Sequence, residues 1–344
     1  MLAKREFRLK QVGLTSLSAL KLSLQGGSNA ENFGLLQTSR SEGGCYSHQD
    51  PGSSWHSLRL GDAVRWTWNG SLGKQTLSDG LRQSLEQARD DAGRLKLLSF
   101  CGGGVYFWWQ LGVSKFLREH YDLSKTKMLG ASGGAFAATL TACGVSAEMA
   151  FASALRQAQE RNLLDKPLGM LGVWGQQLRD WLHELLPPEA ADLCRERVQL
   201  LVTEFPLFKE LALGNFKDRW DLIEVNMASA HVPLVLDYRL TALCRGRMVI
   251  DGGMKDWIFR SRSKAIAVEG AVMIDHHDDN RLVSKRMDMS KPLSSDAVRL
   301  LIDTGYDYGV RQESLGKYDH LDPLLPRQSP APPLPAPTGA AQEQ

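Results

Sequence analysis

The sequence predicts an α/β fold, because short apolar segments alternate along the chain with segments of helical periodicity. Residues 95–100 have the composition of a buried strand and run directly into a glycine loop at 102–104, after which a helix is expected. A second apolar segment, 128–129, leads into the glycine-flanked serine of 130–134, and small helix-compatible residues follow. In mostly parallel sheets such strand–turn–helix units place their turns at one edge, where ligand sites form.

Composition sets the limits of the interpretation. The chain has 344 residues, of which 43% are hydrophobic and 23% charged, which suits one large α/β domain with tails or two smaller domains. A formal net charge of +2 is too close to neutral to indicate a nucleic-acid partner. No run of 18 apolar residues occurs, so no transmembrane helix is expected, although an amphipathic or aromatic patch could still contact a membrane surface.

The cysteines argue against a disulfide framework and against a zinc site. The five are an odd number, widely spaced, with no C-x-x-C pair: Cys45, Cys101, Cys143, Cys194 and Cys244. Buried free thiols in a reducing, intracellular compartment are the expected state.

Residues 1–58 differ in composition from the rest of the chain. The first thirty are basic and serine-rich with a single acid, Glu6, and a Gly/Ser-rich piece follows. This composition is typical of an organelle transit peptide, for a plastid or mitochondrion, and equally of a disordered tail, so both interpretations remain open. Residues 59–94 form an N-terminal extension, with a strand near 64–71 and a polar helix at 79–92.

Further elements follow in order. After the glycine loop, Trp109, Val113, Phe116 and Leu117 have helical spacing, and the aromatic run 106–109 is expected to be helix core rather than an acyl-chain tunnel. A helix at 146–164 should bury a stripe of Met149, Ala152, Leu155 and Ala158. The remaining expected elements are helices at 174–186, 222–230 and 294–311, and strands or extended segments at 198–202, 232–236, 240–244, 247–250 and 265–274. The final segment, 322–344, holds seven of the fourteen prolines and is expected to be a flexible tail.

The glycine-flanked serine has the context of a nucleophile elbow. A tight turn between strand and helix strains the serine backbone and tolerates only small neighbours. Ser132 would then stand at a helix N-terminus, which favours a developing negative charge. A phosphate-binding interpretation of the earlier glycine loop is disfavoured, because no Lys-Ser/Thr follows it and Phe107 stands where a third glycine would belong.

Three motifs stand in order along the chain: Gly102-Gly103-Gly104, Gly130-Ala131-Ser132-Gly133-Gly134, and Asp251-Gly252-Gly253. Together they resemble the patatin-like phospholipase family, whose members are lipid acyl hydrolases. The resemblance is clearest from Leu95 to Asp256, and the segment 99–104 is most similar to the neutral-lipase branch. Residues 227–233 are similar to the family's Ala-Ser-x-x-x-Pro segment. The resemblance implies a three-layer α/β/α fold with a mostly parallel central sheet, in a domain at 95–321.

The resemblance also implies roles for individual residues. Ser132 would be the nucleophile, Asp251 its base, and the amides of the loop glycines the oxyanion hole. The supporting motif residues would be Gly102, Gly103 and Gly104 in that loop, Gly130, Gly133 and Gly134 at the elbow, and Gly252 and Gly253 after the acid. The substrates implied are carboxylic esters of phospholipids, galactolipids or acylglycerols, met at a peripheral membrane or lipid-droplet surface. No cofactor and no metal is implied.

One departure from the family pattern bears on activity. The loop continues Val105-Tyr106-Phe107, so the cation found in plant patatins is missing, and Phe107 replaces a glycine of the neutral-lipase branch. A catalytically weak or inactive lipid-binding protein is therefore one alternative. Another is a Ser-Asp-His esterase using His276 or His277, although the charged segment 275–279 is better explained as a solvated loop than as a catalytic or metal-binding cluster. His231 is expected to be structural.

Overall fold

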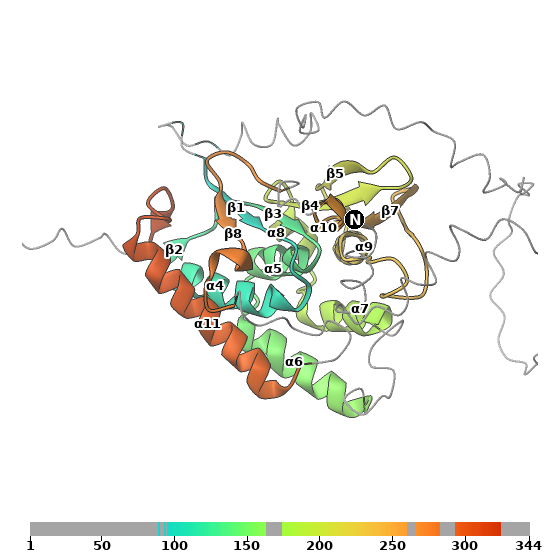
Figure 1. The fold of residues 1–344 in the computed structure, drawn as a ribbon, viewed down its shortest axis with the longest axis horizontal. Helices are drawn as coiled ribbons and strands as arrows, with labels where there is room; N and C mark the ends of the chain where they lie inside the picture. Colours follow the sequence, from blue (N-terminus) through green and yellow to red (C-terminus); the bar gives the residue numbers. More distant parts are fainter. Residues whose placement is uncertain are drawn as a thin grey trace, which may run out of the picture. The chain divides into compact units, whose positions relative to one another are not determined.

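The computed structural model of this chain describes Arg89, Gly93 and residues 95–162, 174–259, 266–282 and 293–324 (Figure 1). The expected N-terminal segment 1–58, the strand near 64–71, almost all of the helix at 79–92 and residues 325–344 of the tail lie outside the described residues. Asp322 and Pro323, at the start of the expected tail, form strand β9 and pair with β2 (Tyr121–Asp122).

A mixed sheet forms the centre of the domain. Four strands run parallel to one another in the order β8–β1–β3–β4. Three more make antiparallel pairs: β5 and β7 with β4, and β6 with β7. The parallel strands are β1 (Leu97–Phe100), β3 (Lys127–Ala131), β4 (Val198–Glu204) and β8 (Val272–Ile274); the antiparallel strands are β5 (Lys209–Leu213), β6 (Ala242–Cys244) and β7 (Arg247–Asp251). The prediction of an α/β fold with a mostly parallel sheet is confirmed.

Strand β4 is longer than its parallel neighbour, and two strands share one of its edges. β5 pairs with β4 from Leu200 to Glu204 and so occupies one edge. On the other edge, β3 pairs as far as Leu201, and antiparallel β7 takes over from Val202. β3 and β7 therefore run towards each other along the same edge of β4.

Side chains alternate between the two faces of the sheet, as strand geometry requires. Leu98, Phe100 and Met128 belong to the large hydrophobic core beneath the helices. Leu97 and Leu129 point to the opposite face, into a smaller cluster that includes Ile266. The larger core lies on the side covered by α4 (Phe107–His120), α5 (Gly133–Ala142) and α9 (Arg219–Ser229).

Helix α4 packs directly against α11 (Ser295–Ser314), and glycines allow the close approach (Figure 1). A Cβ at Gly112 would lie 2.0 Å from the carbonyl oxygen of Ile302, and one at Gly305 would lie 2.0 Å from that of Trp109. The buried carboxylate of Asp279 accepts a hydrogen bond from Trp109 Nε1 at 3.1 Å and ion-pairs with Arg311 at 3.1 Å, which joins the two helices.

The remaining helices and turns complete the described fold. They are η2 (Gly104–Tyr106), α6 (Ala147–Glu160), α7 (Trp174–Leu185), α8 (Ala190–Cys194), α10 (Met254–Phe259) and η4 (His276–Asp278). None of the helices in the described ranges is long and apolar enough to cross a bilayer.

Several local expectations were wrong. Helix α6 buries Ala147, Ala150, Ser153 and Gln157 instead of the expected stripe, and Met149 is 59% exposed. Residues 232–236 form turns, and in the described part of the expected strand 265–274 only 272–274 pairs with the sheet. β5 was not expected, because Lys209 and Glu210 give it the polar composition of an edge strand.

Two other expectations are confirmed in the part of the chain that is described. Trp108 and Trp109 are buried, and Tyr106 and Phe107 pack against the same core, so the aromatic run is core. The four described cysteines are free thiols, among which Cys143 and Cys194 place their sulfurs 3.6 Å apart.

Candidate active site

Ser132 occupies a strained turn between β3 and α5. Its φ of 55° and ψ of −128° lie in a region that non-glycine residues rarely adopt. The turn is possible because its glycines leave room for backbone contact. A Cβ at Gly134 would lie 2.2 Å from Phe100 O, and one at Gly130 would lie 2.6 Å from Gly134 O. The geometry is that of the expected elbow, with the hydroxyl at the N-terminus of α5.

Asp251 ends β7 and is held there by its backbone and by its side chain. The Thr203 hydroxyl donates to the Asp251 carbonyl at 3.0 Å, and the Gly253 N–H donates to Oδ1 at 2.7 Å. A Cβ at Gly252 would lie 2.0 Å from Leu201 O, so only glycine fits where the chain leaves the sheet. The result is a carboxylate that is 3% exposed and fixed in direction.

Burial changes the acidity of this carboxyl group. Desolvation raises the pKa of Asp251 to about 6, against the smaller lowering effects of the Ser132 side chain and the Gly253 N–H. Oδ2 is buried, and the Ser132 side chain lies close enough to the carboxyl group to lower its pKa. A carboxylate that lies beside the Ser132 side chain and has a pKa near neutrality is suited to accept a proton.

The glycine loop lies against Ser132 and against Gly253, two residues after Asp251. A Cβ at Gly102 would lie 3.4 Å from the Cβ of Ser132 and 3.7 Å from the Cα of Gly253. Gly133 is equally close to the loop, since a Cβ there would lie 2.5 Å from Gly104 O. The structure thus brings the three expected motifs to one point, although they are far apart in the sequence.

His276 supports the glycine loop from the side. Its ring is 9% exposed and stacks on Tyr106 with centroids 4.3 Å apart, and a Cβ at Gly103 would lie 2.9 Å from its Nδ1 and Cε1. Burial, and to a smaller extent the charge of neighbouring His277, lowers the pKa of His276 to about 4, so the ring is neutral at neutral pH. Asp275 and Asp279 are buried as well. The expectation that 275–279 is a solvated loop was therefore wrong for Asp275, His276 and Asp279, whereas His277 and Asp278 are exposed.

Asp275, His276 and His277 place three possible metal-ligand atoms within 4.8 Å of one another. Hydrogen bonds already engage this group, because Asp275 Oδ1 accepts the backbone N–H of His277 at 3.0 Å and lies 2.8 Å from its Nδ1. The cluster is explained as a turn that fixes His276 beside the loop, and we assign it no metal.

No described histidine side chain hydrogen-bonds or ion-pairs with the side chain of Ser132 or Asp251. His231 contributes its backbone, since its carbonyl accepts the N–H of Asp251 at 2.8 Å. His231 is 1% exposed, and its Nε2 lies 3.2 Å from Arg239 O. Burial lowers the pKa of its imidazole. These contacts fit the expected structural role.

Ser229 connects the two halves of the site, and sequence reasoning assigned it no role. Its hydroxyl accepts the N–H of Ser132 at 3.1 Å and donates to Leu201 O at 2.7 Å, while its carbonyl accepts the N–H of Gly252 at 2.9 Å. The residue is fully buried at the end of α9. The Ala-Ser-x-x-x-Pro resemblance was the available signal.

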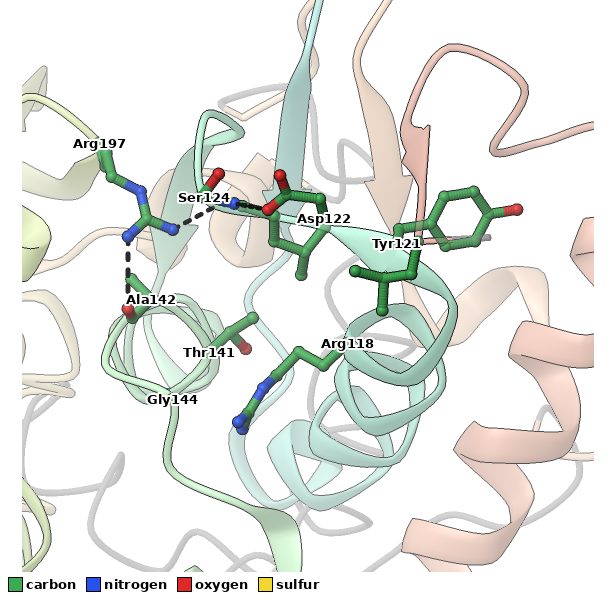
Figure 2. A pocket seen from close by; sticks show the side chains of 10 residues that line it. Arg118, Tyr121, Asp122, Ser124, Thr141, Ala142, Gly144 and Arg197 are labelled. Atoms are coloured by element: carbon green, nitrogen blue, oxygen red, sulfur yellow. Dashed lines mark hydrogen bonds between the residues drawn. The ribbon is translucent and has the colours of Figure 1, made fainter. Parts of the chain in front are cut away.

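A pocket of about 300 Å³ lies at the opposite edge of the sheet, where β3 and β4 begin (Figure 2). Its arginines are directed to backbone carbonyls near the C-terminus of α5: Arg197 donates to Ala142 O at 3.5 Å and Arg118 to Val145 O at 2.9 Å. Such contacts neutralise a helix C-terminus. The pocket contains none of the expected site residues, and we interpret its arginines as structural.

Comparison with known proteins adds a family context. A family model described as patatin-like phospholipase matches residues 98–258, which contain all three motifs. The chain is 26% identical to human "Patatin-like phospholipase domain-containing protein 2" over 167 residues, 46% of this chain and 32% of that protein. It is 31% identical to human "Patatin-like phospholipase domain-containing protein 4" over 78 residues, 23% of this chain and 30% of that protein.

The chain thus spans about a third of the length of these curated relatives. Among solved structures, VipD from Legionella pneumophila matches with 14% identity and a TM-score of 0.30, covering 48% of each chain.

Proposed function

Because residues 98–258 are a domain of the patatin-like phospholipase family, we propose that this chain is a serine hydrolase that cleaves lipid carboxylic esters with a Ser132–Asp251 dyad. The observation that carries the proposal is the meeting of β3 and β7 along one edge of β4. It sets the elbow serine beside a buried carboxylate and against the glycine loop.

In the proposed reaction, Asp251 removes the hydroxyl proton while Ser132 Oγ attacks the ester carbonyl. With a pKa of about 6, Asp251 is mostly ionised at neutral pH and yet basic enough to accept a proton. The Asp251 proton then passes to the departing alcohol. Water, activated by the same carboxylate, attacks the acyl-serine and releases the fatty acid.

The oxyanion of each tetrahedral intermediate would be held by backbone amides at Gly102, Gly103 and Gly104 and by the N-terminus of α5. No cation stands in the described loop at 102–106, so stabilisation rests on the backbone donors and on the rigidity of the loop. The stack of Tyr106 on His276 supplies that rigidity.

The proposal is tested by labelling purified protein with a fluorophosphonate probe and assaying hydrolysis of fatty-acyl esters. Wild-type protein should be labelled and active, whereas Ser132→Ala should be neither. A folded wild-type protein without labelling or hydrolysis on phospholipid, galactolipid and acylglycerol substrates would favour an inactive lipid-binding protein. The compound class hydrolysed fastest identifies the substrate.

A further inference from the structure

Two hairpins extend beyond the edge of the sheet that carries Ser132 and Asp251. β4 continues past Val202, the partner of Asp251, to Glu204 and then turns into β5. β7 approaches Asp251 from the same direction, so Met248 lies three residues farther out. At about 3.3 Å per residue, the outer ends of these strands project roughly 10 Å beyond the catalytic positions.

The projecting ends carry large apolar side chains that are exposed. Leu207 is 74% exposed, Leu243 is 76% exposed and Met248 is 52% exposed, and Phe208 is 37% exposed. We name these four residues the apolar tip. Single exposed apolar residues are ordinary on protein surfaces, but a cluster of them marks an interaction site.

Backbone pairing places the four residues at the same end of the two hairpins. Leu243 and Met248 are cross-strand partners in the β6–β7 pair, so their side chains share a face. The N–H of Phe205 donates to Met248 O at 2.9 Å, which ties the β4–β5 turn to the start of β7. Within that turn, the rings of Phe205 and Phe208 lie 5.9 Å apart.

Among the described residues, three cations near the apolar tip form ion pairs, and exposed Lys209, which follows Phe208, is the exception. Arg247 pairs with Glu204 at 2.6 Å, and Arg245 pairs with Asp221 at 2.7 Å. Lys255, which follows Gly253, pairs with Glu210 at 3.2 Å. Since basic residues attract anionic membranes only when their charge is not neutralised nearby, this surface is suited to an uncharged or zwitterionic partner.

We propose that the apolar tip docks the protein on a zwitterionic lipid surface and so presents the Ser132–Asp251 site to its substrate. The inference rests on the proposed function, because an ester that resides in a lipid layer must leave it to reach a buried serine. Side chains that project past the catalytic edge would enter the layer and bring that edge to its surface.

The test compares full-length wild-type protein with the double variant Leu207→Glu, Leu243→Glu. The matched control is Leu300→Glu, Leu315→Glu, whose leucines are 54% and 75% exposed on or just after α11. Flotation with phosphatidylcholine vesicles measures docking. Hydrolysis of vesicle phosphatidylcholine, and of a short-chain ester below its solubility limit, measures catalysis at a surface and in solution.

The tip variant should lose at least tenfold in flotation and in vesicle hydrolysis, because burying one leucine side chain changes partitioning by roughly tenfold or more. Its soluble-ester hydrolysis and fluorophosphonate labelling should stay within twofold of wild type, which also shows that it folds. The control variant should match wild type throughout. Addition of phosphatidylserine should change flotation of wild type less than threefold.

Equal flotation of the tip variant and wild type would overturn the proposal, as would an equal loss in the control. A strong requirement for phosphatidylserine would replace the apolar contact with an electrostatic one. If the wild-type protein were dimeric without lipid and the tip variant monomeric, the apolar tip would instead be a contact between two copies of the chain. Docking without any hydrolysis would instead contradict the proposed function and leave the docking surface standing.

Discussion

Ser132 and Asp251 sit where two strands meet end to end: Ala131, directly before the serine, pairs with Leu201, and Asp251 pairs with the next residue of β4, Val202. A continuous strand, β4, therefore sets the separation of the proposed nucleophile and base. Displacement of β7 by one residue would move the carboxylate by about 3.3 Å and turn it to the other face of the sheet.

The first prediction concerns the dyad. Ser132→Ala should abolish ester hydrolysis and fluorophosphonate labelling. Asp251→Asn should lower kcat by roughly 10²–10⁴, because it removes a positioned base while keeping the shape of the side chain. Ser314→Ala and Asp303→Asn, both exposed on α11, are the matched controls and should keep wild-type rates. Retained activity in folded Ser132→Ala would exclude this serine as the nucleophile.

The second prediction is a pH profile. Because the proposed base, Asp251, must be ionised to accept a proton, activity should rise with pH around its pKa of about 6 and level off above it. Titration of His276 cannot produce this rise in activity near pH 6, because its pKa is lowered to about 4. The rise in activity near pH 6 should therefore persist in the His276→Phe variant. A rate independent of pH between 5 and 8 would contradict the assignment of Asp251.

The third prediction links the same group to stability. The pKa of Asp251 is 3.8 in a solvated reference state and about 6 in the fold, so the folded state binds the proton more tightly. Its contribution to stability is present below pH 4 and is lost as pH rises through 6; the gap corresponds to roughly 3 kcal/mol.

Asp251→Asn should accordingly unfold at a higher temperature than wild type at pH 7.5, and its advantage should shrink at pH 4. Thermal melts of both proteins at the two pH values measure this. A variant that is less stable than wild type at pH 7.5 would show that the ionised carboxylate stabilises the fold.

The fourth prediction separates the dyad from a Ser-Asp-His triad. His276→Phe preserves the stack on Tyr106, and His277→Gln alters an exposed ring, so each should keep activity within about tenfold of wild type. A tenfold change corresponds to about 1.4 kcal/mol of barrier. If either folded variant lost as much activity as Ser132→Ala, that histidine would be the base.

The fifth prediction tests Ser229 as a positioning residue. Ser229→Ala leaves the N–H of Ser132 without its acceptor, and a lost buried hydrogen bond costs about 1–3 kcal/mol. We expect a lower melting temperature and a reduced kcat with little change in KM. Ser229→Thr restores the hydroxyl and is the control. If Ser229→Ala lowered stability alone, with kcat intact, the bridge would be structural only.

The sequence predicted which motifs meet at the candidate site more fully than it predicted the elements around them. The glycine motifs are detectable because several of their positions admit no side chain: a Cβ at Gly130, Gly133, Gly134 or Gly252 would lie within 2.6 Å of a backbone atom. Ser229 and His276 have common residue types, and their roles arise from hydrogen bonding and stacking between distant segments. Likewise, Met149 fits a helical stripe by spacing, but only the packing of neighbouring helices decides which face of α6 is buried.

The arrangement of β3 and β7 along β4 also has a consequence for folding. β1, β3 and α5 follow one another in the sequence and can assemble early, through local contacts. β7 comes much later in the chain, after α9, the helix that ends at Ser229. The proposed base therefore joins the elbow only when β7 pairs with β4, and a nascent chain in which β7 has not yet emerged carries an elbow serine without Asp251.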